Sequence, residues 1–259
     1  MNTNKNSYTF IYASVMVIIV AFLLAFVSSA LKPMQQKNIE LDKKKQVLAA
    51  LNIFEKDNAA AEAAYNNYVK ADQLLDAQGN VVAETGGFAV ENAAVGGDKL
   101  PVYVCEVEGD TKYVLPLYGA GLWGPIWGYV ALNADKETIY GVYFSHAGET
   151  PGLGAEITNY EKFQKPFIGK NAIDAAGNVV ISVVKNGKVQ NAECEVDGIS
   201  GGTITSNGVN AMLKDGLGLY KAFLTPCDKA CEQACPAAAC DSTACPESVP
   251  ATKIQVVNQ

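Results

Sequence analysis

Arginine is missing from this chain of 259 residues: all 20 of its basic side chains are lysines, and its formal charge is −7. Domains that bind nucleic acid usually carry clustered arginine and lysine on a basic surface, so we expect no nucleic-acid partner. Without a guanidinium group, a bound phosphate must be held by lysine, by hydroxyl or backbone N–H groups, or by a covalent bond.

Histidine is almost missing too, because His146 is the only one. A Ser-His-Asp catalyst would have to use it, and a histidine-rich metal centre cannot be built. Cys105 and Cys194 fall in expected strands and are expected to be small core residues. The other five cysteines lie beyond residue 226 at spacings that match neither zinc ribbons nor ferredoxins. We therefore predict no metal site, and we assign no catalytic residue.

A long uncharged segment, SYTFIYASVMVIIVAFLLAFVSSAL, occupies residues 7–31. A helix of this length spans roughly 37 Å, which exceeds the roughly 30 Å hydrocarbon core of a bilayer. Ser28-Ser29-Ala30 resembles a signal-peptide cleavage site, but the apolar part of a signal peptide is only about 7–15 residues long. We expect a retained, single-pass transmembrane helix in contact with membrane lipid.

Lysines flank this segment unevenly. Lys5 precedes it, whereas Lys32, Lys37 and the run at 43–45 follow it. The positive-inside rule, applied to this bias alone, places the following domain in the cytoplasm.

Changes in amino-acid composition divide the rest of the chain into segments. Residues 33–56 have leucine and valine at helical spacing among charges, and 58–76 are rich in alanine, so both stretches are expected to be helical. Beyond Thr225 the chain has five cysteines and little periodicity, which is typical of a tail that is disordered or clipped by disulfides. The predicted organisation is an N-terminal tail at 1–6, a transmembrane helix at 7–31, a helical stalk at 32–78, a folded domain at 79–225 and a tail at 226–259.

The folded domain reads as α+β. PIWGYVALN and TIYGVYFSH are joined by Ala134-Asp135-Lys136, which predicts a hairpin, and Asn186-Gly187 between two strand-like runs predicts another. Residues 204–224 show one apolar helical face. We therefore expect an antiparallel sheet with peripheral helices. The residues of the apolar helical face are Val209, Met212, Leu213, Gly216, Leu217, Tyr220 and Leu224.

The run DGISGGTITS, at 197–206, leads from a glycine-rich turn into that helix. Such a turn lets backbone N–H groups approach an anion, and the helix dipole favours negative charge there. Thr203 and Thr205 add hydroxyl groups at the same place. Ordinary helix capping by Ser200 or Thr203 is the alternative explanation.

These residues resemble a known motif. Asp197 to Thr203 is similar to the flavinylation motif (Asp, two variable residues, Ser or Thr, Gly, Ala, Thr) of an FMN-binding domain family. The family includes the C subunit of the sodium-translocating NADH:quinone reductase and the G subunit of the Rnf complex. In the family a flavin transferase joins FMN to the last threonine through a phosphoester, and the resemblance assigns this role to Thr203. Gly202 stands where the family usually has alanine. Ser200, Gly201, Gly202 and Thr205 are expected to help to bind the cofactor, with Asp197 as motif support.

A second signature of the same family, Glu-Thr-Pro-Gly-Leu-Gly, is intact at 149–154. Glycines allow close backbone approach to a flat ring, Thr150 offers a hydroxyl, and Leu153 offers an apolar surface. Alone, the run would predict a plain Pro-Gly turn. With both motifs present in order, we expect the flavin to be bound by Glu149, Thr150, Gly152, Leu153 and Gly154.

Weaker similarity surrounds these motifs. GLWGPIWGYVAL at 121–132 and TSNGV at 205–209 resemble the sodium-pump member of the family more than the Rnf member. Trp123 is a candidate flavin contact or a core residue, and Lys185 either places a cation near the flavin or is solvated.

The resemblance implies an electron-carrier component of a sodium-translocating NADH:quinone oxidoreductase in a bacterial inner membrane. Its covalent FMN would relay electrons among partners that include the B, D and E subunits, and the soluble domain would face the periplasm, against the charge bias. Two alternatives stay open. The G subunit of an Rnf complex would have the same covalent FMN, and a non-redox, membrane-tethered binding domain would hold an anion or other ligand without flavin.

Overall fold

The computed structural model describes residues 6–97 and 99–225. The predictions for the segments at 1–5 and 226–259, including the cysteine-rich tail, lie outside the described residues. The helices are α1 (Asn6–Ala50), α2 (Asn58–Tyr68), α3 (Thr203–Leu219) and α4 (Lys221–Leu224), with short turns η1 (Gly87–Ala89), η2 (Asn92–Ala94), η3 (Gly154–Thr158), η4 (Tyr160–Gln164) and η5 (Lys165–Phe167). The strands are β1 (Val69–Leu75), β2 (Val81–Ala83), β3 (Leu100–Val107), β4 (Asp110–Ala120), β5 (Pro125–Leu132), β6 (Ile139–His146), β7 (Ser182–Val184) and β8 (Glu195–Asp197).

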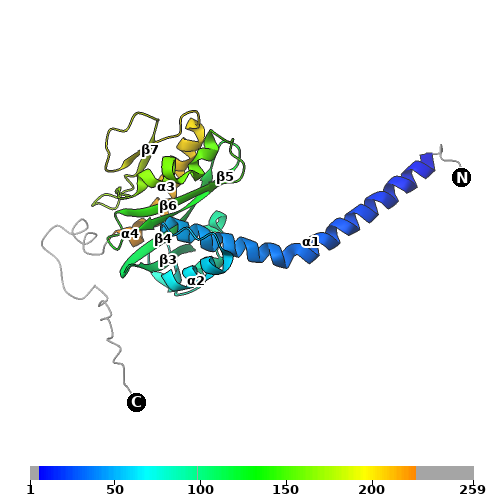
Figure 1. Cartoon of the computed structure of the whole chain (residues 1–259), viewed down its shortest axis with the longest axis horizontal. Helices are drawn as coiled ribbons and strands as arrows, with labels where there is room; N and C mark the ends of the chain where they lie inside the picture. The colour runs from blue at the N-terminus through cyan, green and yellow to red at the C-terminus, as the bar shows by residue number, and fades with distance from the viewer. Residues whose placement is uncertain (1–5, 98, 226–259) are drawn as a thin grey trace, which may run out of the picture. The chain divides into compact units, whose positions relative to one another are not determined.

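The predicted apolar segment and the first part of the predicted stalk form one continuous helix, α1 (Figure 1). Its N-terminal part is long and apolar enough to cross a membrane, and the most apolar stretch is entirely unburied within the chain. Its last turn, by contrast, is buried from Val47 to Ala50 and packs with residues of the sheet. α1 therefore joins a segment of membrane-spanning character directly to the folded domain.

Six antiparallel strands make the main sheet, in the order β2-β1-β3-β4-β5-β6. The predicted hairpin of β5 and β6 is confirmed: the strands pair from Ile126 opposite His146 to Leu132 opposite Ile139. The α+β class and the antiparallel sheet are confirmed as well.

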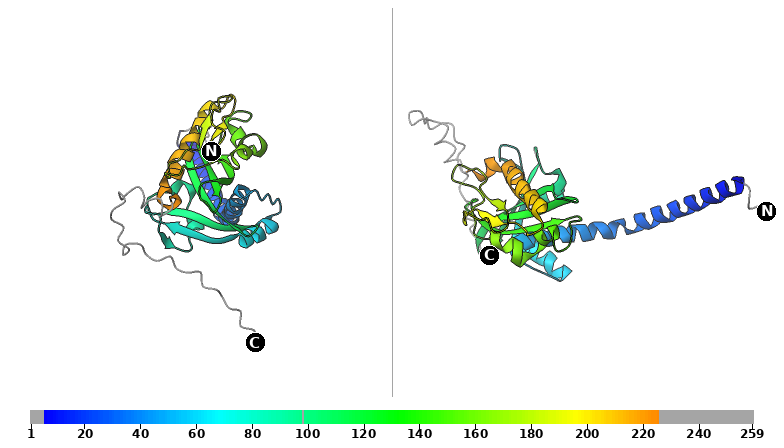
Figure 2. Two further views of the ribbon diagram at one scale, coloured as in Figure 1. Left: turned by 90° about the vertical axis from the view of Figure 1, so that its left-hand side faces the viewer. Right: turned by 90° about the horizontal axis from the view of Figure 1, so that it is seen from above.

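Both faces of the sheet are covered, because side chains along each strand alternate between two apolar clusters. In β3, Val102 points into the cluster under α3, and Tyr103 points into the cluster under α1 and α2. Figure 2 shows α3 and α2 on opposite sides of the sheet. The result is a three-layer arrangement in which one layer, α3, carries the glycine-rich motif at its start.

The helical prediction for the end of the stalk is wrong beyond Tyr68. Residues 69–75 form β1, which pairs with β3 from Val69 opposite Cys105 to Leu75 opposite Leu100. The helix preference of alanine, glutamine and leucine amounts to less than about 1 kcal/mol per residue, and pairing with a buried neighbouring strand outweighs it. The sheet therefore begins ten residues earlier than the predicted domain boundary at residue 79.

The hairpin predicted at Asn186-Gly187 is also wrong. A turn does form there, with the N–H of Lys188 donating to the carbonyl of Lys185 at 2.9 Å. A second turn follows, where the N–H of Glu195 donates to the carbonyl of Asn191 at 2.9 Å. The two turns reverse the chain twice, so β7 and β8 pair in parallel.

The predicted apolar face is confirmed, since all seven of its residues are buried. The predicted single helix is divided, however: α3 ends at Leu219, Tyr220 is its C-cap, and Leu224 belongs to α4.

α3 lies very close to β4, because glycines occur where the backbones meet: a Cβ at Gly208 would collide with the carbonyl oxygen of Ala120, and one at Gly216 would press on Leu117. This close packing places the N-terminus of α3 beside the loop that follows β4.

Candidate functional site

The two glycine-rich motifs meet in space. Residues from both line one hollow of about 230 Å³ at the N-terminus of α3. Eight of the residues predicted from the sequence line it, and Leu122 and Ile204 complete the lining. The eight are Glu149, Thr150, Leu153, Gly154, Gly201, Gly202, Thr203 and Thr205.

Each motif builds a four-residue turn with a glycine in third place. The N–H of Leu153 donates to the carbonyl of Thr150 at 3.1 Å, and the N–H of Gly202 donates to that of Ile199 at 3.0 Å. Gly152 and Gly201 have φ angles of 75° and 78°, a region that glycine enters without a steric cost. The turns also touch, because a Cβ at Gly201 would lie 2.8 Å from Cδ2 of Leu153.

Thr203 is the first residue of α3, and its side chain is exposed. Gly202 precedes it as the N-cap and supplies no capping side chain, and the first turn contains no acidic residue. The first N–H groups of a helix have no partner within the helix and carry a partial positive charge. This end of α3 is therefore suited to an anion beside the Thr203 hydroxyl. The alternative explanation, capping of the helix by Ser200 or Thr203, is not supported, because no side-chain cap hydrogen bond forms there.

Glu149 lies beneath that turn and is 5% exposed. Its Oε2 accepts a hydrogen bond of 2.6 Å from the Thr205 hydroxyl, and its Oε1 accepts one of 2.9 Å from the backbone N–H of Trp123. Thr205 itself is 1% exposed. One carboxylate thus connects the loop after β4, the second glycine-rich motif and the first turn of α3.

Burial raises the pKa of Glu149, but several interactions outweigh it and leave the pKa below the usual value for glutamate. They are the hydrogen bonds from Thr205 and from the backbone at Trp123 and Leu122, with a smaller contribution from His146. The carboxylate is therefore ionised at neutral pH. His146 also orients this loop, since its Nδ1 accepts a hydrogen bond of 3.1 Å from the N–H of Glu149.

Small residues make room for this arrangement. A Cβ at Gly121 would collide with Oε1 of Glu149, and a Cβ at Gly154 would collide with the Thr205 hydroxyl. Gly202 is also tightly surrounded: a Cβ there would lie 3.1 Å from Cγ2 of Ile199 and 3.3 Å from the N of Gly154. The alanine usual in the family's motif would require these neighbours to shift by a few tenths of an ångström.

The remaining predicted residues lie outside the hollow. Gly152, Asp197 and Ser200 line a neighbouring hollow of about 450 Å³, and the N–H of Gly187 donates to Oδ1 of Asp197 at 2.7 Å. Lys185 is exposed in the turn after β7 and lines neither hollow. Trp123 is 69% exposed, which excludes the core alternative for its side chain.

Sequence reasoning missed Leu122 and Ile204. Both are apolar and yet exposed, at 47% and 58%, and Leu153 is 44% exposed beside them. One feature of the sequence could have identified Ile204. It lies between two threonines of the predicted site, and it is not among the residues of the predicted apolar face of the helix. Leu122 gave no such signal, because an apolar residue in a loop is usually assigned to the core.

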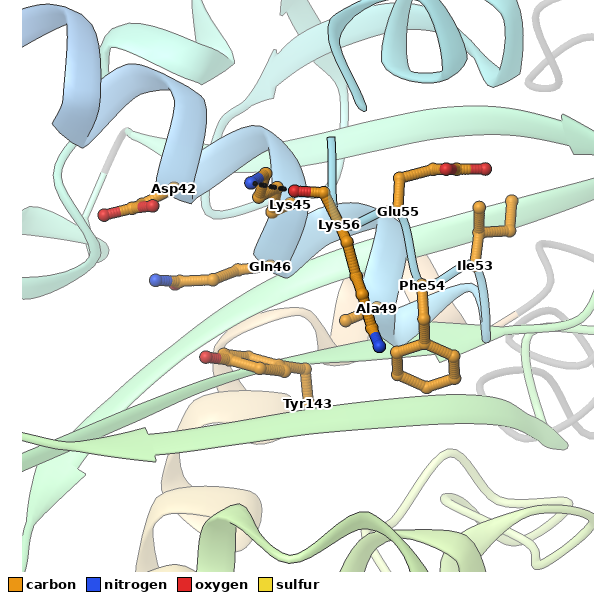
Figure 3. A pocket seen from close by; sticks show the side chains of 9 residues that line it. All are labelled: Asp42, Lys45, Gln46, Ala49, Ile53, Phe54, Glu55, Lys56 and Tyr143. Atoms are coloured by element: carbon orange, nitrogen blue, oxygen red, sulfur yellow. Dashed lines mark hydrogen bonds between the residues drawn. The ribbon is translucent and has the colours of Figure 1, made fainter. Parts of the chain in front are cut away.

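A larger hollow, of about 380 Å³, lies where α1 meets β6 (Figure 3). It is lined by side chains of both charges, such as Asp42 and Lys45, and by the exposed ring of Phe54. It contains no residue of either glycine-rich motif. Chemistry rather than size therefore identifies the hollow at α3 as the candidate site.

Comparison with known proteins covers the region that contains this site. The model of the FMN-binding domain family matches residues 121–218, which include both motifs. The crystal structure of the C subunit of the Na(+)-translocating NADH-quinone reductase from Parabacteroides distasonis is similar at a TM-score of 0.70 and 44% identity, covering 76% of this chain and 98% of that one.

Curated relatives extend the similarity into the N-terminal region. The C subunit of the Na(+)-translocating NADH-quinone reductase of Haemophilus ducreyi is 30% identical over 85% of this chain and 95% of its own length. Its counterpart in Pasteurella multocida is 37% identical over 73% of this chain and 80% of its own length. The chain belongs to the family of C subunits of the Na(+)-translocating NADH-quinone reductase, an oxidoreductase complex.

Proposed function

We propose that this chain is the membrane-anchored electron carrier of a Na(+)-translocating NADH-quinone reductase, with FMN joined through its phosphate to the hydroxyl of Thr203. The observation that carries the proposal is the exposed Thr203 at the uncapped start of α3, on the wall of the hollow that both motifs share. The FMN-binding family match over residues 121–218 supports the choice of cofactor.

The phosphate fits the helix terminus. A phosphodiester on Thr203 would keep one negative charge, and the free N–H groups at the start of α3 favour an anion there. In this chain without arginine, a covalent bond also replaces the guanidinium groups that often retain a phosphate.

The flavin ring fits the exposed apolar side chains of the hollow. Leu122, Leu153 and Ile204 would be partly covered by a flat ring lying beside Thr203, and burying apolar surface stabilises binding. Bound FMN supplies the electron-transfer chemistry, so the protein needs to hold and orient the group and needs no general base.

α1 would anchor the domain in the inner membrane, and the other subunits of the complex would supply and accept the electrons. The apolar, unburied N-terminal part of α1 supports the anchor. The names of the relatives support membership in a complex of several subunits. A flavin transferase would be needed for maturation, because Glu149, the acidic side chain among the residues that line the hollow, accepts its hydrogen bonds from Thr205 and Trp123 and not from Thr203.

The test is the intact mass of the chain after co-expression with a flavin transferase. We expect wild type to gain the mass of one FMN less one water, and Thr203→Ala to gain nothing, because the variant has no hydroxyl to esterify. A peptide map should place the added mass on the peptide that contains Thr203. Thr205→Ser keeps a hydroxyl group at position 203 and another at position 205. It is the matched control and should be modified like wild type.

Two outcomes would contradict the proposal. Flavin on Thr203→Ala would move the attachment site, and an unmodified wild type beside a modified control protein would favour the non-redox binding domain. The Gly202→Ala variant tests another reason for an unmodified wild type. If this variant is modified and wild type is not, Gly202 blocks the transferase and the native chain does not carry covalent FMN.

A further inference from the structure

Glu149 makes no contact that requires a cofactor. Both carboxylate oxygens are already bonded within the protein, Oε2 to the Thr205 hydroxyl and Oε1 to the N–H of Trp123. A buried carboxylate is costly unless hydrogen bonds compensate for its lost hydration, and here they do. Its direct partners are the loop after β4 and the first turn of α3, which points to a structural role for the carboxylate at this site.

The segments that Glu149 joins are far apart in sequence. Thr205 is 56 residues from Glu149, and Trp123 is 26 residues from it. Gly121 and Gly154 leave just enough space for the carboxylate, since a side chain at either would collide with it. Thr205 lies two positions after Thr203 in the first turn of α3, so the bond from its hydroxyl restrains that turn.

We propose that Glu149 is a positioning residue for flavin attachment: its carboxylate ties the first turn of α3 to the loop at 121–124, and so fixes where Thr203 presents its hydroxyl. This inference rests on the proposed function, because it concerns how the attachment threonine is held. Leu122, in the same loop, lines the hollow together with Ile204, so the same bond would also hold Leu122 in place.

The experiment measures the rate of flavin attachment to purified chain at saturating flavin transferase and flavin donor. Glu149→Gln cannot accept both hydrogen bonds, because its amide nitrogen is a donor. Thr205→Val has nearly the shape of threonine but no hydroxyl. We expect both variants to be modified roughly tenfold more slowly than wild type, since small misplacements of a reacting group are costly.

Two controls separate positioning from general damage. Thr205→Ser restores the hydroxyl and should recover the rate to within about twofold of wild type, as expected when only the hydrogen bond matters. Asp174→Asn makes the same kind of change in a turn elsewhere, where Oδ1 accepts from the N–H groups of Ala176 and Asn178, and should leave the rate unchanged. Hydrogen exchange of the Trp123 amide in flavin-free chain measures how well its hydrogen bond to Glu149 is formed. We expect this exchange to be faster in Glu149→Gln.

The outcomes distinguish this inference from the proposed function. If wild type takes up no flavin, the proposed function fails and the positioning role fails with it. If wild type is modified at Thr203, and Glu149→Gln and Thr205→Val are modified as fast as wild type, the positioning role alone is overturned. Slow Thr205→Val with recovery in Thr205→Ser supports it even if Glu149→Gln does not fold.

Discussion

The fold changes the proton affinity of Lys43 on α1. Its Nζ donates hydrogen bonds of 2.6 Å to the carbonyl groups of Phe88 and Val90 and lies 4.9 Å from the centre of the Phe88 ring. Burial lowers the pKa of Lys43 to about 8, although the nearby carboxylates of Glu91 and Asp72 act in the opposite direction. This residue therefore links the end of α1 to the loop before β3 in a way that depends on pH.

The sign of that dependence follows from proton binding. Between about pH 8 and pH 10.5 the unfolded chain keeps the Lys43 proton and the folded chain releases it, so the free energy of unfolding rises with pH in this window. We expect wild type to gain stability relative to Lys43→Met between pH 8 and pH 9.5, measured by denaturant unfolding at each pH. Parallel curves for the two proteins would contradict the lowered pKa.

Individual site residues differed in how far they were predictable. Thr203 stood out because a recognisable motif surrounds it and because the motif ends where the helix begins. The hydrogen-bond partners of Glu149 could not be predicted, because a sequence does not indicate which hydroxyl or N–H group donates to a buried carboxylate. Lys185 looked suitable by charge, but it lies in the first turn after β7, where it is exposed and does not line the hollow.

Among the elements, α3 packs closely against β4. Gly208 faces the carbonyl of Ala120 without room for a methyl group, whereas nothing lies within 4 Å of a Cβ placed at Gly218 in the last turn of the same helix. The two glycines thus share one helix and differ in their surroundings, which makes them a matched pair for testing the packing.

Gly208→Ala should destabilise the domain by about 2 kcal/mol, because helix and strand must separate to accept the methyl group. Gly218→Ala should be neutral or stabilise by about 0.5 kcal/mol, since alanine loses less backbone entropy in a helix. Thermal and denaturant unfolding of the two variants measure both effects. Equal stability of the two variants would mean that α3 is not packed tightly on β4.

The molecule as a whole combines an apolar helix with a domain whose sheet holds the site. Three of the lysines that follow the apolar segment make contacts with the folded domain: Lys43 with the loop before β3, Lys44 with Glu62 at 2.6 Å, and Lys45 with Asn58 at 2.7 Å. Their presence therefore has a reason in the fold, separate from the orientation of the helix in a membrane. This weakens the charge argument for a cytoplasmic domain and leaves the periplasmic placement as our proposal.

Labelling of single cysteines in intact cells tests that placement. In a chain whose native cysteines are replaced by serine, Glu193→Cys lies on an exposed part of the domain, and Asn4→Cys precedes the apolar segment. We expect an impermeant thiol reagent to label Glu193→Cys in intact cells and Asn4→Cys only after permeabilisation. The reverse pattern would place the domain in the cytoplasm.

Features that depend on neighbours in the chain could be predicted from the amino-acid sequence. The apolar helix, the β5–β6 hairpin, the buried face of α3 and both glycine-rich turns follow from hydrophobic period, turn residues and local backbone preference. Other features depend on contacts between distant segments: residues 69–75 are a strand because β3 pairs with them, and β7 and β8 are parallel because two turns intervene. Glu149 and Thr205 meet for the same reason, since contacts between distant segments depend on packing that no local pattern encodes.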